Sequence, residues 1–137
     1  MGKSAIKPRA SRPTMPKIDD DMRHLCASIG GELSTWPRVI SRRMFGMVGF
    51  YREGLNKPTI FAALPDKRAL SSPRAIAFKL DKPKPAQLSR MKSEARLSTA
   101  VFNGRAVKWF EFSLESPADI PGALFWLGEA YTAARHK

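Results

Sequence analysis

The stretch that decides the fold is SRRMFGMVGFYREG, from Ser41 to Gly54. It belongs to two segments rich in β-branched and aromatic residues, 38–45 and 47–52, which flank Gly46. Two such segments joined by a glycine predict a β-hairpin, in which Gly46 and Gly49 permit a bulge or a close approach of the backbone. We expect the large apolar side chains to pack in the interior: Met44, Phe45, Phe50 and Tyr51.

Further strands follow this hairpin along the chain. TIFAAL (59–64) and AIAFKL (75–80) have strand character, so the four segments together predict an antiparallel meander. Asn103-Gly104 is a strong hairpin signal because both residue types tolerate positive φ. We expect it to join a strand near residues 99–102 to another over 106–114.

Helical patterns occupy three other regions, 18–33, 81–98 and 116–137. The first has a clear apolar period, Pro85 suits the first turn of the second, and Ser116 is a good N-cap for the third. The predicted fold class is therefore α+β: an antiparallel sheet, made of a four-strand meander plus a C-terminal hairpin, with about three helices packed on one face.

Charge is the compositional feature that stands out, because the 137-residue chain carries a formal net charge of +12. Residues 1–17 hold five basic and no acidic residues, and we interpret them as a disordered basic arm preceding a single domain over 18–137. Such charge favours a polyanion, and phosphates could be neutralised by the arm and by the region between Lys67 and Arg96. The candidate polyanion-binding residues are Lys3, Lys7, Arg9, Arg12, Lys17, Lys82, Lys84, Arg90 and Lys92.

Catalytic and metal-binding patterns are weak in this sequence. The chain has one cysteine, Cys26, and two histidines, His24 and His136. His24 and Cys26 diverge on a helix, and a small buried hydrophobe is the ordinary role of such a cysteine. We therefore predict no catalytic residue, metal ligand or cofactor, and a protein that is not an enzyme.

An alternative function rests on Glu111, which lies between aromatic residues. Strand alternation places Phe110 and Phe112 on a core face, and Trp109 with Glu111 on a partly exposed one. A salt bridge from Glu111 to Arg42 or Arg43 is the simpler interpretation. The alternative is a small-molecule-binding or enzymatic pocket formed by four residues: Arg43, Tyr51, Trp109 and Glu111.

The last helix carries apolar side chains beyond a single stripe. Phe125 projects away from the main apolar face and Trp126 flanks it. Extra apolar surface of this kind is typical of a second contact, so Phe125 and Trp126 are a candidate surface for a homodimer, although a loop could cover Phe125 instead.

Membrane insertion is not indicated by the sequence. No run of about 18 apolar residues is present, and the N-terminus lacks the apolar region of a secretory signal. Together with the single cysteine, this predicts a cytoplasmic protein with no membrane partner.

The hairpin motifs resemble the TfoX N-terminal domain family and, more loosely, the YjbR/MmcQ-like proteins. The similarity covers roughly residues 20–135, although Met47 stands where the family has a second glycine. The resemblance implies an α+β fold without an assigned enzymatic activity. The basic residues favour a binding role, either with a nucleic acid, without sequence preference, or with a regulatory protein. The matching elements are Arg43-Met44-Phe45-Gly46, Gly49-Phe50-Tyr51, Gly54, Phe61-Ala62 and Phe78-Lys79.

Overall fold

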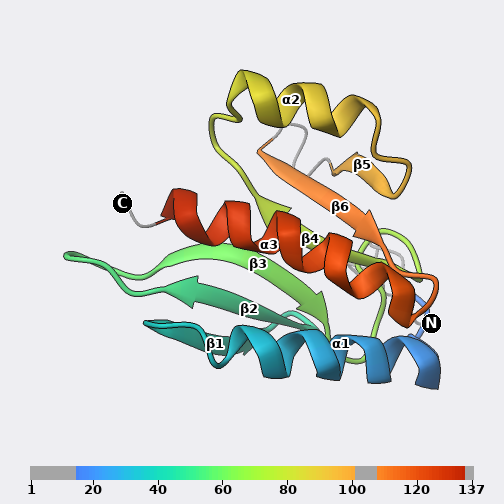
Figure 1. The fold of residues 1–137 in the computed structure, drawn as a ribbon. Coiled ribbons are helices and arrows are strands. Elements are labelled where there is room, and N and C mark those ends of the chain that lie inside the picture. Colours follow the sequence, from blue (N-terminus) through green and yellow to red (C-terminus); the bar gives the residue numbers. More distant parts are fainter. Residues whose placement is uncertain (1–14, 101–107, 135–137) are drawn as a thin grey trace, which may run out of the picture.

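The protein forms one six-stranded antiparallel sheet with three helices, as seen in a computed structural model that describes residues 15–100 and 108–134 (Figure 1). This arrangement confirms the predicted α+β class. The elements in chain order are α1 (Asp20–Leu33), β1 (Val39–Met44), β2 (Met47–Arg52), β3 (Thr59–Pro65), β4 (Ala75–Lys79), α2 (Pro85–Lys92), β5 (Leu97–Ala100), β6 (Trp109–Ser113), the 3-10 turn η2 (Pro117–Asp119) and α3 (Ile120–Ala134).

The predicted hairpin is the pair β1 and β2, which are joined by the two residues Phe45 and Gly46. Both have positive φ, 51° and 79°, as a two-residue type I′ turn requires. The expectation that Phe45 packs inside is wrong, because the turn points its side chain outward and leaves it 93% exposed. Gly49 does serve close packing, since an added Cβ would lie 3.2 Å from the Tyr51 ring.

The sheet continues the meander through β3 and β4, and its full order is β1-β2-β3-β4-β6-β5. The last hairpin joins the sheet through β6, which pairs with β4 and leaves β5 at the edge. β5 begins at Leu97, two residues before the predicted strand, and α2 ends earlier than the predicted helix. The turn predicted at Asn103-Gly104 lies outside the described residues.

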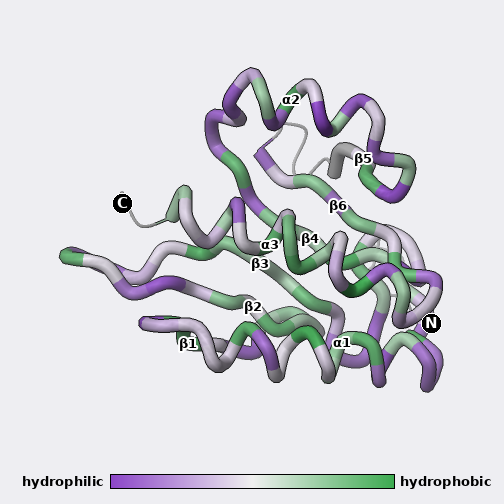
Figure 2. The backbone as a smooth tube through the Cα atoms, in the orientation of Figure 1, coloured by the Kyte–Doolittle hydropathy of each residue, from purple (hydrophilic) through white to green (hydrophobic). Residues whose placement is uncertain are grey.

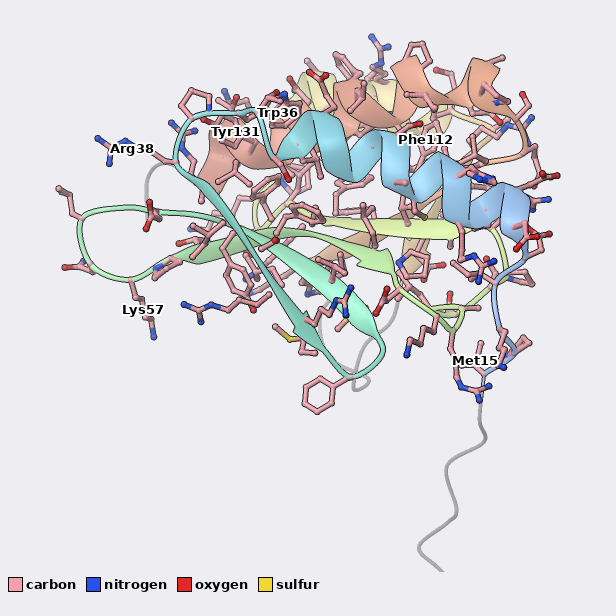
Figure 3. The ribbon with its side chains drawn as sticks, turned by 90° about the horizontal axis from the view of Figure 1, so that it is seen from below. Met15, Trp36, Arg38, Lys57, Phe112 and Tyr131 are labelled. Carbon is pink, nitrogen blue, oxygen red and sulfur yellow. The ribbon has the colours of Figure 1, made fainter. Side chains whose placement is uncertain are left out.

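One face of the sheet is covered by α1 and α3, which lie side by side across it (Figures 1 and 3). Phe50, Phe61, Phe78 and Phe112 project from the sheet into the core and are at most 4% exposed. The apolar stripe predicted over residues 18–33 meets them and is entirely buried, although its first member, Ile18, precedes α1: Ile18, Met22, Leu25, Ile29 and Leu33. The helices thus close a two-layer core, as predicted.

An aromatic cluster fastens the end of α3 to the sheet. Trp36, from the loop after α1, lies with its ring centroid 5.1 Å from that of Tyr131, and Phe61 of β3 contacts both rings (Figure 3). The Tyr131 hydroxyl donates a hydrogen bond to the Pro37 carbonyl at 2.6 Å. Aromatic contacts of this kind add to the burial energy, so the cluster fixes the position of α3.

Capping groups define where the helices begin. The Asp19 side chain accepts a hydrogen bond from the Met22 amide, and the Ser116 hydroxyl accepts one from the Ala118 amide, as expected for Ser116. None of the helices within the described residues combines the length and the apolar character that crossing a bilayer requires.

Candidate functional site

The predicted pocket of Arg43, Tyr51, Trp109 and Glu111 does not form. These residues lie on β1, β2 and β6, and two strands, β3 and β4, separate β2 from β6. Neighbouring strands are about 4.8 Å apart, so roughly 14 Å lies between β2 and β6. Arg43 also faces the other side of the sheet from Tyr51, because it pairs with Val48. Its guanidinium instead lies 3.8 Å from Asp66.

Glu111 is buried rather than partly exposed, with 5% of its surface accessible. Both predicted partners, Arg42 and Arg43, are on the distant strand β1, so the expected salt bridge is absent. Both carboxylate oxygens of Glu111 instead accept from the hydroxyl of Ser71, in the loop between β3 and β4. Sequence alternation placed Glu111 on the correct face but could not show that this loop covers it.

The neighbouring Arg42 and Tyr51 contact each other on the outer face of the sheet. The Arg42 guanidinium lies 5.3 Å from the centre of the Tyr51 ring. This is the range of a cation–π contact, so the two side chains stabilise the hairpin locally.

Cys26 is a core residue of α1, as expected, and is 8% exposed. Burial raises the pKa of its thiol to about 12, which disfavours the nucleophilic thiolate near neutral pH. His24 is exposed on the same helix, whereas His136 lies outside the described residues. No group of three or more metal-ligating side chains is found within residues 15–100 and 108–134.

Of the two residues proposed as a homodimer surface, Phe125 is exposed and Trp126 is buried. Trp126 is fully buried, its ring stacks on Phe78 with centroids 5.7 Å apart, and its indole nitrogen donates to Glu94 at 3.3 Å. Placing it on a dimer surface was therefore wrong. Phe125 is 37% exposed, but the Arg90 guanidinium lies 3.8 Å from its ring centre.

A basic surface is formed by α2 and the loop before it. We define the α2 basic surface as Lys82, Lys84, Arg90 and Lys92, which are all exposed. Residues 82–93 contain these four cations and no carboxylate. Figure 2 shows hydrophilic residues along this segment, in contrast to the apolar strands β3 and β4. Four of the nine predicted polyanion-binding residues thus lie on α2 and the loop before it.

The remaining predicted cations belong to the basic arm. Lys3, Lys7, Arg9 and Arg12 lie outside the described residues. Lys17 forms an isolated bridge with Arg68, and the adjacent Ile18 amide donates to the Lys67 carbonyl at 3.0 Å. Residues 15–17 therefore pair with the loop after β3, so the boundary predicted after residue 17 lies too late.

A cavity that the sequence did not predict has a volume of about 360 Å³ and lies between β3, the end of β4, α2 and α3. Its apolar wall includes Ala130, Ala133 and Ala134 of α3. These alanines follow one another at helical spacing, but a small-residue stripe is equally typical of close helix packing. Only the placement of α2 shows that they border open space.

The fold and these surfaces define a small α+β domain with a basic helix at one side of its sheet. No family model matches the chain, and no curated protein matches it. The crystal structure of Deinococcus radiodurans protein DR2400, a domain of the family DUF419, is similar with a TM-score of 0.48 and 20% identity. The similarity covers 84% of this chain and 76% of that chain.

Proposed function

We propose that this protein is a non-enzymatic domain that binds nucleic acid through the α2 basic surface, without reading its sequence. The observation that carries the proposal is the run of four exposed cations without a carboxylate over residues 82–93. Lysine and arginine side chains that contact phosphates release counterions and bind every sequence alike. The basic arm adds to this charge.

The geometry of α2 supports contacts with a phosphate backbone. Lys84, at its N-cap, and Lys92, at its last position, are eight residues apart and thus about 12 Å apart along the helix axis. Phosphates of one DNA strand advance about 3.4 Å each along the duplex, so the two lysines span three to four of them. Since Leu88 between them is also exposed, this face of α2 is open to a partner.

A binding role is favoured over catalysis by the residues themselves. Cys26 is buried with a raised pKa, and the residues of the predicted pocket are dispersed over the sheet. We also propose that the chain is TfoX N-terminal domain-like. This is supported by the order of its motifs, since Arg43-Met44-Phe45-Gly46 forms the first turn and Phe78-Lys79 ends β4.

Fluorescence anisotropy with short labelled duplexes tests the proposed function. At about 50 mM salt, we expect the full chain to bind two duplexes of unrelated sequence with similar Kd. A triple variant, Lys82→Gln, Lys84→Gln and Lys92→Gln, should bind at least tenfold more weakly, since each lost phosphate contact removes counterion release. Arg90 is kept because it supports α2 by stacking on Phe125.

A matched control removes the same charge elsewhere. Arg38→Gln, Arg43→Gln and Lys57→Gln change exposed positions outside the region from Lys67 to Arg96, and this triple variant should keep most of the affinity. Equal losses in the two variants would show that only net charge matters, and the α2 surface would then not be the site. Unchanged binding by the α2 variant would leave an acidic regulatory protein as the partner to test.

A further inference from the structure

The cavity of about 360 Å³ lies where the two halves of the sheet separate. β3 and β4 are paired at Ala62 with Phe78 and at Ala63 with Ala77. Beyond Phe78 the chain follows β6 instead, because the Leu80 amide donates to the Lys108 carbonyl at 2.8 Å. Figure 1 shows β4 rising toward α2 while β3 continues with β1 and β2. The C-terminal half of α3 lies against the opening.

The inner wall of the cavity is apolar and made of small side chains. Ala130, Ala133 and Ala134 come from α3, and Ile60 and Leu80 come from the separating strands. Larger side chains at these three alanine positions would fill the cavity between β3 and β4. A space of this volume with an apolar wall is at the lower end of the range for small-molecule sites.

The rim of the cavity is positively charged. Lys79, Lys82 and Lys84 border it together with two carboxylates that already have partners. Asp81 lies 3.7 Å from the Lys79 ammonium, and Glu129 accepts from the Gln87 amide at 2.7 Å. Among the described residues, no carboxylate is within 4.0 Å of the ammonium groups of Lys82 and Lys84.

We propose that this cavity binds an aliphatic carboxylate, such as a medium-chain fatty acid. The hydrocarbon chain lies against Ile60, Leu80 and Ala133, while the carboxylate meets Lys82 and Lys84 at the rim. Each buried CH₂ group strengthens binding by about fourfold, and the lysines favour an anionic head over a neutral one. The carboxylate would share Lys82 and Lys84 with the α2 basic surface, whereas the apolar wall belongs to the cavity alone. Octanoate binding at that wall therefore tests this site whether or not the chain binds nucleic acid.

Titration of the ¹⁵N-labelled full chain with sodium octanoate tests the proposal by NMR. We expect saturable shifts of amides around the cavity, at Leu80, Gln87 and Ala133, with a Kd on the order of a millimolar or below. Butyrate, with four fewer CH₂ groups, should bind at least tenfold more weakly, and octanol, with no charge, severalfold more weakly. Absence of these shifts, or octanol binding as tightly as octanoate, would overturn the proposal.

Two pairs of variants separate the cavity from nonspecific association. Ala133→Phe fills the space from a partly exposed position and should abolish the shifts, whereas Ala27→Phe on the exposed side of α1 should keep them. Lys82→Gln with Lys84→Gln should raise the octanoate Kd roughly three- to tenfold, and Lys67→Gln should leave it unchanged. Octanoate binding that survives Ala133→Phe undiminished would place the ligand elsewhere and contradict the proposal.

Discussion

Phe45 occupies a turn position that is unfavourable for its side chain. Its φ of 51° is in the left-handed region, which a bulky residue adopts only at a cost of roughly 1–3 kcal/mol. The ring recovers none of this cost by packing, because it is 93% exposed. Phe45 keeps this conformation because β1 and β2, which flank the turn, are paired with each other.

Replacing Phe45 by asparagine should therefore stabilise the protein. Asn-Gly is the preferred pair for this turn, so Phe45→Asn is expected to raise the free energy of unfolding by about 1 kcal/mol. Phe45→Ala, which keeps the unfavourable φ, should give no comparable gain. Urea unfolding followed by circular dichroism measures both, and a loss of stability in Phe45→Asn would show that the Phe45 side chain contributes to the fold.

The Ser71–Glu111 pair is the other residue-scale feature with a clear energetic consequence. Ser71→Ala leaves the buried Glu111 carboxylate without this donor and should cost about 1–3 kcal/mol. In a Glu111→Gln background the same substitution should cost less, because an uncharged amide is less expensive to bury. A double-mutant cycle from chemical unfolding measures the difference, and equal costs in the two backgrounds would refute the coupling.

At the scale of elements, α2 is the most weakly anchored helix, since none of its residues is buried. It is held to α3 by Arg90 over the Phe125 ring and by Gln87 bonded to Glu129. α1 and α3, in contrast, each bury five residues. Local opening follows the amount of buried contact, so α2 should open more often than either.

Hydrogen exchange measured by NMR tests this difference in anchoring. We expect α2 amides to exchange faster than those of α3, and Phe125→Ala to speed α2 exchange a further two- to fivefold through loss of the cation–π contact. Leu55→Ala, at a fully exposed loop residue, serves as the control and should change nothing in α2. Protection of α2 equal to that of α3 would mean that it is anchored by more than these contacts.

Local sequence patterns predicted most helices and strands, but they did not predict which individual side chains are buried. That burial depends on contacts with segments that are distant in the sequence. The first hairpin and the stripe of α1 follow from period and turn chemistry, which are local. Glu111 and Trp126 were misjudged because their burial depends on distant segments, the loop carrying Ser71 and the strand carrying Phe78. The burial predicted for Phe45 was wrong because Phe45 lies in the turn. Its side chain therefore does not follow the alternation of the strand and points into solvent.

At the scale of the whole molecule, the arrangement of strands determines which predicted residues can meet. β2, β3 and β4 lie between the strand of Arg43 and the strand of Glu111, so the predicted pocket could not form. β3 and β4 pair at Ala62–Phe78 and Ala63–Ala77 but diverge beyond these residues, and this divergence opens the cavity beside α3. Neither the dispersal of the predicted pocket nor the presence of the cavity could be predicted from a single sequence, because both depend on which strands pair.

The net charge of +12 is a property of the whole chain. Only the fold shows which of the basic side chains lie near one another. Lys84 and Lys92 are exposed and share a face of α2 by helical spacing, and the exposed Lys82 lies just before the helix. Arg42 instead lies on the outer face of the sheet. Binding through the α2 basic surface requires that Lys82, Lys84 and Lys92 contact phosphates.

The slope of log Kd against log salt concentration measures how many phosphates these lysines contact. Each phosphate contact contributes about 0.9 to the slope for a duplex. The triple variant Lys82→Gln, Lys84→Gln, Lys92→Gln should therefore have a slope smaller than that of the unmodified chain by roughly two to three. The control variant Arg38→Gln, Arg43→Gln, Lys57→Gln should have the same slope as the unmodified chain. Identical slopes for the α2 variant and the unmodified chain would contradict the account.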